Sequence, residues 1–435
     1  MKTELKNKEF FERLDRSAAD DIRAFQDGAL RRRTAFLAER YPFHAERLGG
    51  LPPEGVGLDA LQTLPTMDKR VLEKAGDTLA PPSGDVVDIA YSSGTTGSAL
   101  KIPFTEAALK RLEWNEFRAL SICGLSKTDT VLLSCTMDRC FIAGLAYQLG
   151  CRAVGAASIR VGAAPLGVHW KAIEENRPTT IVGVPSFLAK LAEAAPDLGG
   201  NAASAGVARL VCIGEPLRDR GIAPLPLTEK IERLWNAKAL STYASTEICA
   251  AFCECEKQAG GHLIPELAVA EILDDDGNPL PPGEPGEVVL TPLGDGAAPL
   301  LRFRTGDVSF LIDEPCACGR NTPRLGPIIG RKHQLLKHKG TAFYPNAIHA
   351  ALSALDDVLE HQVVVRRDNL SDDVAVLVAL RPGASAEKTA EILRTALRVG
   401  VKVEQLPLED IRKRVFPEGK RKPVRFVERQ GGDEG

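Results

Sequence analysis

Hydrophobic and polar positions follow different periods in successive parts of this 435-residue chain. Residues 8–47 have the spacing of an amphipathic helix. Between about residues 85 and 243, short apolar runs typical of strands alternate with longer amphipathic runs typical of helices. This alternation predicts a mostly parallel sheet covered by helices.

The pattern changes in the last third of the chain. From about residue 262 to 312, short strand-like runs are separated by Asp, Gly and Pro, which predicts antiparallel strands of a small distorted barrel. From Arg331 onward the runs indicate a compact α+β unit. We therefore predict an α/β protein with a large N-terminal domain of several subdomains, residues 1–330, and a small α+β domain, residues 331–435.

Composition narrows the class of protein. The 55 Lys and Arg residues nearly balance the 58 Asp and Glu residues, so binding to nucleic acid or to a membrane surface is not indicated. The N-terminus lacks the pattern of a signal peptide, and no run approaches the ~20 apolar residues of a membrane helix. Ten scattered cysteines then suggest reduced thiols or metal ligands. We expect a cytoplasmic protein.

One loop has the composition of an anion-binding site. Residues 91–101 read YSSGTTGSALK, after a predicted strand and before a helix that Thr105 would cap. A glycine-rich turn in that position gathers backbone N–H groups around an anion such as phosphate. The stretch fails the P-loop pattern, because Gly94 and Gly97 are too close together and Ile102 follows Lys101. Composition alone fits an ordinary surface turn as well.

The order of residues in this loop resembles the phosphate loop of the adenylate-forming superfamily, which includes the acyl- and aryl-CoA ligases. Five further fragments follow in the superfamily's order: IGEP at 213–216, YASTE at 243–247, RFRTGD at 302–307, GR at 330–331 and EGK at 418–420. Each is weak alone, but together they span residues 91–420. The segments YPFHAERLGGL, LPTMDKRVL and GEPLRDRG most resemble the phenylacetate-CoA ligase branch.

The resemblance implies a site that joins the carboxylate of an acid to the α-phosphate of ATP. Two anions meet in that step, so the site needs cations and oriented N–H donors. The residues implied to bind the nucleotide are Ser92, Ser93, Gly94, Thr95, Thr96 and Gly97 in the loop, then Gly214, Glu215, Pro216, Tyr243, Ala244, Ser245, Thr246, Asp307 and Arg331.

The family's pattern also implies individual roles. The loop hydroxyls would hold the phosphates, and residues 214–216 would line the adenine pocket, where glycine permits close approach. Tyr243 would stack on adenine, and Asp307 would accept hydrogen bonds from the ribose hydroxyls with help from Arg331.

Two residues would carry the chemistry. Glu247 would supply an oxygen ligand for Mg²⁺, which bridges phosphate oxygens. Lys420 would reach the carboxylate and the α-phosphate from a mobile C-terminal domain. The alternative for Glu247 is a solvated surface acid, and for Lys420 a solvated tail, since it lies in the basic run GKRK. Lys422 would replace Lys420 if the register differed by two.

The cysteines suggest a separate metal site. Cys255, His262, Cys316 and Cys318 offer three thiols and an imidazole, which suffice for a tetrahedral zinc site. Relatives in the phenylacetate-CoA ligase branch often carry a C-x-C-G-R segment at this place. The alternatives are free cysteines, or a site in which Cys253 replaces Cys255. We expect structural rather than catalytic zinc.

Two positions depart from the family's pattern. Relatives usually have Asp where His333 stands, at the hinge of the small domain, so the side-chain partner of that hinge is open. Many have Gly where Ala244 stands. If this residue forms the floor of the acyl pocket, its methyl group favours a smaller or differently oriented acid than an extended aryl group.

Together with the resemblance, these features predict an ATP-dependent acid–CoA ligase that uses ATP, Mg²⁺ and coenzyme A. The acid, expected to be aromatic or arylacetic, would first form acyl-AMP and pyrophosphate; the thiol of CoA would then displace AMP. One alternative is a related synthetase with an acceptor other than CoA, and another is an inactive nucleotide-binding protein. Homodimers are common among such relatives.

Overall fold

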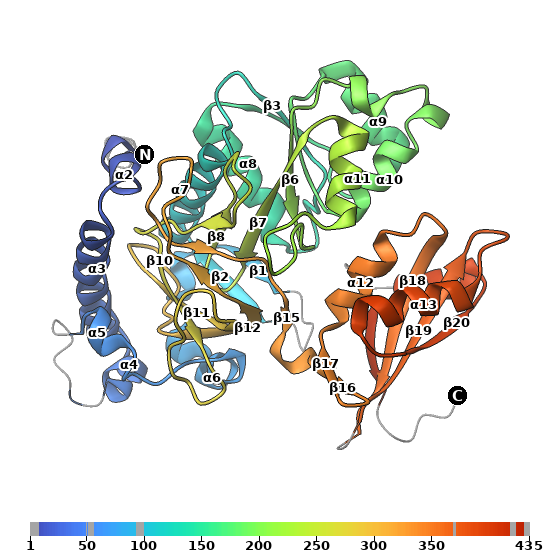
Figure 1. Cartoon of the computed structure of the whole chain (residues 1–435). Coiled ribbons are helices and arrows are strands. Elements are labelled where there is room, and N and C mark those ends of the chain that lie inside the picture. The colour runs from blue at the N-terminus through green and yellow to red at the C-terminus, as the bar shows by residue number, and fades with distance from the viewer. Residues whose placement is uncertain are drawn as a thin grey trace. The chain divides into compact units, whose positions relative to one another are not determined.

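The computed structural model describes residues 8–48, 50, 56–92, 100–368, 371–417 and 423–429. The chain divides into two compact units (Figure 1). The first comprises Met1–Pro224 and Lys230–Ile328, and the second comprises Leu225–Glu229 and Ile329–Gly435. The predicted domain boundary at Gly330–Arg331 lies two residues beyond this division and stays a prediction.

A long mixed sheet organises the first unit. Its strands follow the order β13-β14-β9-β8-β7-β6-β5-β3-β4, in which β3 to β7 are parallel neighbours and β7, β8, β9, β14 and β13 are antiparallel. The predicted parallel sheet is therefore confirmed. The strands are β3 (Thr130–Leu133), β4 (Ala157–Arg160), β5 (Thr180–Gly183), β6 (Arg209–Ile213), β7 (Lys238–Ser245), β8 (Ala250–Cys253), β9 (Gly261–His262), β13 (Leu311–Ile312) and β14 (Arg324–Leu325).

Helices cover both faces of the parallel strands, which explains why these strands are continuous apolar runs. Figure 1 shows α7 (Glu106–Ile122) and α8 (Ile142–Val154) on one face, and α9 (Leu166–Asn176) and α10 (Pro185–Glu193) on the other. Trp170 of α9 stacks on Trp235, at the end of α11 (Pro226–Trp235), with ring centroids 5.8 Å apart. The tryptophans thus serve packing, as core tryptophans usually do.

The N-terminal segment is broken into three helices instead of one: α2 (Lys8–Leu14), α3 (Ala19–Arg40) and α4 (Pro42–Arg47). Proline at the first position of α4 suits a new helix start after Tyr41. Short helices follow before the first strand. They are α5 (Leu58–Leu61), α6 (Lys69–Ala75), η2 (Gly76–Leu79) and η3 (Ser83–Asp85), while η4 (Pro196–Leu198) and η5 (Ala202–Ser204) lie farther along.

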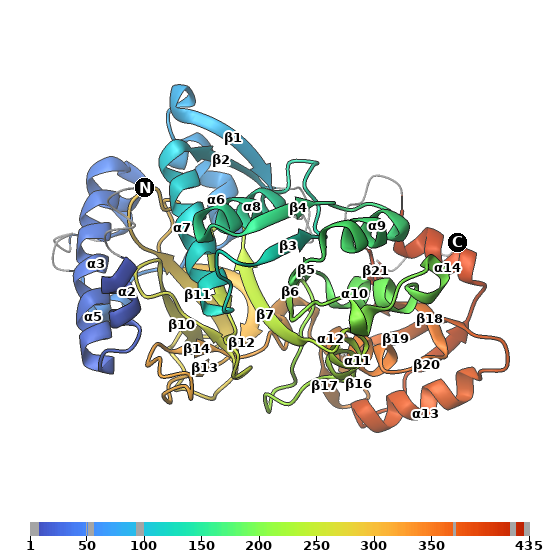
Figure 2. The same cartoon turned by 90° about the horizontal axis from the view of Figure 1, so that it is seen from above.

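The loop YSSGTTGSALK joins two strands, whereas the sequence suggested that it leads from a strand into a helix. β1 (Val86–Tyr91) and β2 (Lys101–Thr105) form an antiparallel hairpin beside α7 (Figure 2). Residues 101–105 form a strand because Phe104 is buried against the helices that follow. The predicted cap is confirmed, since the Thr105 hydroxyl accepts a hydrogen bond from the N–H of Ala108.

The predicted antiparallel region forms a second sheet in this unit. β10 (Ala268–Leu273) pairs antiparallel with β11 (Gly286–Pro292), and β11 pairs antiparallel with β12 (Phe303–Ser309). Its buried residues share one apolar cluster with Leu30 and Leu37 of α3. The long N-terminal helix is therefore part of the core of this unit.

The second unit is the predicted α+β fold. Its sheet has the order β20-β19-β18-β21, in which the central pair is antiparallel and each edge strand is parallel to its neighbour. The elements are η6 (Lys332–Gln334), β15 (Gly330–Arg331), β16 (Leu336–His338), β17 (Thr341–Phe343), α12 (Pro345–Ser353), β18 (Val358–Arg366), β19 (Asp373–Leu380), α13 (Ala386–Leu397), β20 (Lys402–Gln405), α14 (Leu408–Val415) and β21 (Phe426–Arg429). His333 lies in η6, and its carbonyl accepts a hydrogen bond from Arg367 at 2.8 Å.

None of the helices within the described ranges is long and apolar enough to cross a membrane.

A buried carboxyl group in α7 makes the stability of the first unit depend on pH. Glu116 is 3% exposed, and one of its carboxyl oxygens has no hydrogen-bond partner among the described residues. Burial raises its pKa from 4.5 to about 7. The folded state therefore holds this proton more tightly than the unfolded chain does. Stability should fall as pH rises from about 4.5 to about 7, and stay lower above that.

We expect Glu116→Gln to raise the free energy of unfolding at pH 8 by about 3 kcal/mol and to leave it unchanged at pH 4. The neutral amide keeps the shape of the protonated acid without a buried charge. Urea unfolding at pH 4, 6 and 8 measures the difference. Glu106→Gln, at a side chain 67% exposed on the same helix, is the control. A gain at pH 8 no larger than that at pH 4 would contradict the account.

Candidate functional site

The first group of predicted residues lies after β6. Gly214 has a φ of +79°, a conformation that favours glycine, and it begins the turn. The carboxylate of Glu215 accepts hydrogen bonds from the hydroxyl of Ser186 at 2.7 Å and from its backbone N–H at 2.9 Å. The turn is thereby attached to the start of α10. Glu215 therefore holds the shape of the loop that would line the adenine pocket.

The end of β7 brings two predicted residues together. The Tyr243 hydroxyl donates a hydrogen bond of 2.9 Å to the carboxylate of Asp307, which lies on β12. Ala244, the next residue, is exposed, so its methyl group faces open space. Segments far apart in the sequence thus meet at the end of β7. The resemblance implied a role for each residue but not this contact.

Glu247 follows the same strand and is held by two partners. The Lys69 ammonium lies 2.8 Å from one carboxylate oxygen, and the Ser245 hydroxyl donates to the other at 2.9 Å. Burial alone would raise the pKa of Glu247, but the Lys69 charge and the Ser245 hydroxyl outweigh it, and the pKa lies below its usual value. Glu247 is therefore an ionised carboxylate that is 8% exposed, which is a suitable oxygen ligand for a divalent cation.

Lys69 is a site residue that the sequence analysis missed. It is the first residue of α6, where the helix dipole disfavours a cation. Two residues earlier, Met67 is fully buried. Its N–H donates a hydrogen bond to the carbonyl of Arg302, and its carbonyl accepts one from the N–H of Arg304 on β12. Lys69 is thus fixed in place by the strand that carries Asp307. Its only sequence signal was membership of the segment LPTMDKRVL.

Six of the predicted site residues lie outside the described residues: Ser93, Gly94, Thr95, Thr96, Gly97 and Lys420. Ser92 is buried. Its hydroxyl accepts a hydrogen bond from the N–H of Leu100, and its own N–H donates to the carbonyl of Leu100. Arg331 lies in β15 of the second unit. Pro216 and Thr246 lie in the two segments described above.

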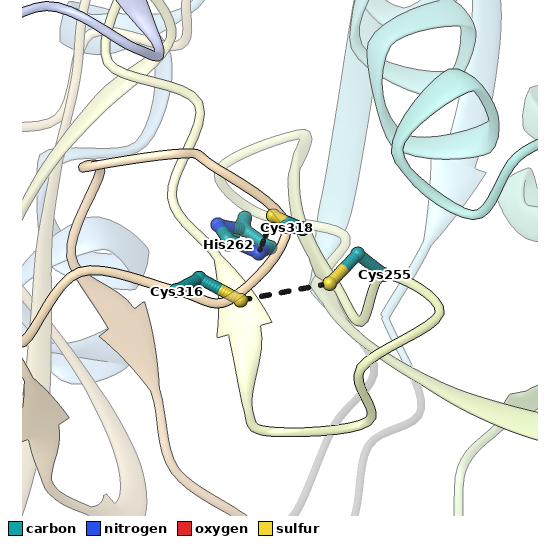
Figure 3. Close-up of side chains that lie close together, drawn as sticks. All are labelled: Cys255, His262, Cys316 and Cys318. Carbon is teal, nitrogen blue, oxygen red and sulfur yellow. Dashed lines mark hydrogen bonds between the residues drawn. The ribbon is translucent and has the colours of Figure 1, made fainter.

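The predicted metal ligands come together. The ligand atoms of Cys255, His262, Cys316 and Cys318 all lie within 4.8 Å of one another (Figure 3). The sulfurs of Cys255 and Cys316 are 3.8 Å apart, and the sulfur of Cys318 is 3.5 Å from Nε2 of His262. Cys253 instead contacts the Thr242 hydroxyl at 3.0 Å. The structure therefore favours Cys255 over Cys253.

Neighbouring groups set the orientation and the protonation state of His262 in this cluster. Nδ1 of His262 contacts the Thr322 hydroxyl at 3.1 Å, which leaves Nε2 facing the thiols. Burial lowers the pKa of His262 to about 3, so the imidazole is neutral, as a metal ligand must be. The Arg320 guanidinium donates to the sulfur of Cys318 at 3.4 Å. Three thiols and a neutral imidazole at this spacing fit zinc.

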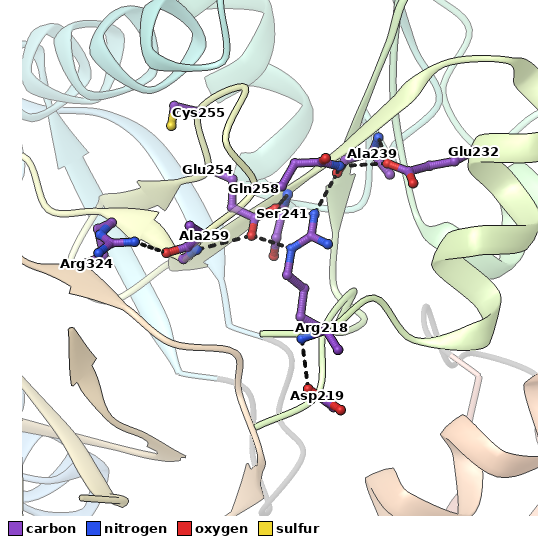
Figure 4. A network of polar contacts seen from close by, with 12 residues as sticks. Arg218, Asp219, Glu232, Ala239, Ser241, Glu254, Cys255, Gln258, Ala259 and Arg324 are labelled. Atoms are coloured by element: carbon purple, nitrogen blue, oxygen red, sulfur yellow. Dashed lines mark hydrogen bonds and ion pairs between the residues drawn. The ribbon is translucent and has the colours of Figure 1, made fainter. Parts of the chain in front are cut away.

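A buried ion pair fixes the turn that carries Cys255 (Figure 4). The Arg218 guanidinium binds the Glu254 carboxylate at 2.7 and 3.1 Å, and both side chains are at most 5% exposed. Glu254 also accepts from the N–H of Ser241, and Arg324 donates to the carbonyl of Ala259. These contacts hold residues 254–260 against β7. The position of Cys255 is therefore fixed by contacts within the protein chain.

Comparisons with known proteins agree with the predicted family. The sequence model described as AMP-binding enzyme matches residues 47–293. The phenylacetate-coenzyme A ligase of Thermus thermophilus is 30% identical over 384 residues, covering 86% of this chain and 85% of that protein. The phenylacetate-coenzyme A ligase of Escherichia coli is 26% identical over 383 residues, covering 85% of this chain and 84% of that protein.

A solved structure extends this likeness to the fold. The structure of 2-hydroxyisobutyryl-CoA ligase in the postadenylation state, in complex with 2-HIB-AMP, has a TM-score of 0.84. It is 20% identical in sequence, and the match covers 96% of this chain and 92% of that one. At this identity the likeness establishes the fold alone.

Proposed function

This chain belongs to the AMP-binding enzyme family, and on that premise we propose that it activates a carboxylic acid with ATP and transfers the acyl group to coenzyme A. The observation that carries the proposal is the meeting of family segments at the end of β7, where Tyr243 contacts Asp307 and Glu247 is held ionised by Lys69. A site that joins a carboxylate to a phosphate of ATP would need ionised groups of both signs, and these residues supply them.

The described residues can be given separate tasks. Asp307, which accepts a hydrogen bond from Tyr243, would also accept hydrogen bonds from the ribose hydroxyls. The turn after β6 would contact the adenine. Glu247 would hold Mg²⁺, which neutralises phosphate charge when bound. Lys69, released from Glu247 as phosphates arrive, would donate to them. Lys420 and the loop hydroxyls of Thr95 and Thr96 complete the proposal from the sequence alone.

The acid is proposed from two observations. The curated relatives above are named for phenylacetate, which supports an aromatic or arylacetic acid. Ala244 is exposed at the end of β7, and its methyl group would make a pocket there shallower than a glycine would. We therefore favour a compact aromatic or arylacetic acid over an extended one.

The cysteine cluster would hold structural zinc. It ties the turn after β8 to the loop before β14, and its donors fit zinc without leaving a position for substrate. No catalytic step is assigned to it.

A pyrophosphate-release screen with and without CoA tests the function. Aryl, arylacetic and short aliphatic acids are supplied with ATP and Mg²⁺. We expect release with a compact aromatic acid and consumption of CoA in equal amount. Release without CoA consumption would point to another acceptor, and no release with any acid would overturn the proposal.

Lys69→Met is expected to slow pyrophosphate release roughly tenfold to a hundredfold and to weaken binding of MgATP. A hydrogen bond from a charged group contributes about 1.5–3 kcal/mol, which corresponds to that range. Stopped-flow measurement gives the rate, and calorimetry without acid gives the affinity. Conversion of supplied acyl-AMP and CoA to thioester should be unchanged, because pyrophosphate has already left.

The matched control is Lys74→Met, an exposed lysine on the same helix. It should leave ATP affinity and both half-reactions unchanged. If Lys69→Met slows both half-reactions equally, Lys69 acts only by supporting the fold around Glu247.

A further inference from the structure

The first unit contains a large cavity whose chemistry the proposed function does not explain. Its volume is about 1230 Å³, and it lies between α3, the β1–β2 hairpin, α6 with η2, and the loop of residues 294–300. Most of its lining side chains are apolar. The proposed adenylation site touches it at Glu247.

One face of α3 forms an apolar wall of this cavity. Phe25, Ala29 and Phe36 lie on the lining at helical spacing, and Phe36 is 49% exposed. Across the cavity lie Ile89 and Pro103 of the hairpin, which are paired neighbours on its two strands. Ile89 is also 39% exposed. Large apolar side chains left exposed around a cavity mark a binding site for an apolar group.

A buried arginine lies on the same wall. Arg33 is 5% exposed, and its Nη2 donates to the carbonyls of Ala297 and Ala298. Its Nε has no hydrogen-bond partner, and among the described residues its guanidinium forms no ion pair. Arg111 is a second buried cation nearby, and together with burial it lowers the pKa of Arg33 to about 10. Asp295 favours the charge of Arg33, but among the described residues no carboxylate lies within ion-pair distance of it, so an anion bound here would stabilise the unit.

The charges on the lining limit the size of that anion. Arg32, Arg33 and Lys101 are the basic residues of the lining, and Glu73, Glu247, Glu266 and Asp295 are the acidic ones. Lys69 pairs with Glu247 and Arg118 pairs with Glu266, so among the described residues three basic side chains face two acidic ones without such a partner, and this small positive balance suits a monoanion better than a polyanion such as pyrophosphate or a nucleotide. A single carboxylate that reaches Arg33 meets less repulsion, and an arginine fork suits its geometry.

We propose that this cavity is a second binding site, distinct from the acid pocket of the proposed reaction, for a fatty acid whose carboxylate pairs with Arg33 and whose chain lies between α3 and the hairpin. The proposal does not depend on the adenylation reaction. Its test therefore uses binding without ATP or Mg²⁺.

The test is calorimetric titration of the full chain with dodecanoate and, separately, with dodecan-1-ol, below the concentrations at which they form micelles. We expect dodecanoate to bind, Arg33→Met to weaken it at least tenfold, and dodecanol to bind weakly with no response to that variant. Arg23→Met, at a side chain 61% exposed on the same helix, should bind dodecanoate normally.

A second variant tests the apolar wall of the cavity and not the pairing of the carboxylate with Arg33. Ala29→Phe places a ring in the cavity and should abolish binding of both probes. Circular dichroism melting confirms that each variant is folded. Absence of dodecanoate binding to the unaltered chain would overturn the proposal. So would equal affinity in Arg33→Met, or pyrophosphate release with dodecanoate at a rate that Ala29→Phe leaves unchanged, since the fatty acid would then be a substrate.

Discussion

Replacing Lys420 with alanine is expected to slow pyrophosphate release at least about a hundredfold, while supplied acyl-AMP and CoA still form thioester at a nearly normal rate. Its ammonium would face the negative charge that builds as the carboxylate meets the α-phosphate. Loss of such a preorganised partner costs ~3 kcal/mol or more. Thioester formation starts from acyl-AMP, when pyrophosphate has already left and the carboxylate no longer carries its negative charge. The two half-reactions, measured separately, give the comparison.

Lys413→Ala is the matched control, because Lys413 is an exposed lysine of α14 in the same basic segment. It should leave both half-reactions unchanged. Equal damage to both half-reactions by Lys420→Ala would mean that the variant disturbs the fold of the second unit. Damage to neither would transfer the role to Lys422 or remove it from this segment.

Loss of one ligand from the proposed zinc site is expected to produce the largest effect on stability. Cys316→Ser should lose about one equivalent of zinc per chain and melt roughly 10 °C lower. Structural zinc contributes its binding free energy to folding, and a change of 1 kcal/mol shifts the melting of a domain of ~200 residues by about 2–4 °C. Elemental analysis and thermal melting, with and without a chelator, measure both quantities.

Two serine variants separate this cluster from the other cysteines. Cys140→Ser, at an exposed thiol, should keep the metal and the melting temperature. Cys253→Ser should keep the metal as well, because Cys253 contacts Thr242 and not the cluster. Protein that is metal-free as purified, with the same melting temperature as Cys316→Ser, would exclude a structural metal.

The sequence by itself predicted what depends on neighbouring residues. The strands of the parallel sheet, the cap at Thr105 and the elements of the second unit all follow local patterns, because the side-chain period and capping chemistry act within a few residues. The order of short motifs was enough to identify the family. The sequence also indicated which residues come together in the candidate metal cluster, since few residue types bind zinc.

Tertiary structure decided every pairing between distant segments. The contact of Lys69 with Glu247 and that of Tyr243 with Asp307 depend on β12 packing near β7. No local rule states which lysine of a polar segment reaches a buried carboxylate. The choice of Cys255 over Cys253 likewise depends on the folded chain. Cys253 ends β8 and contacts Thr242, whereas Cys255 lies beyond the strand and beside Cys316.

The hairpin and the cavity show the same limit. Residues 101–105 form a strand because Phe104 is buried in the core. The preceding stretch, rich in Gly, Ser and Thr, has too little hydrophobic pattern to predict that packing. Arg33 is one of three consecutive arginines in α3, and only the folded chain shows that it is the buried one. Local sequence specifies elements and chemical groups, whereas burial and partners arise when distant elements exclude water between them.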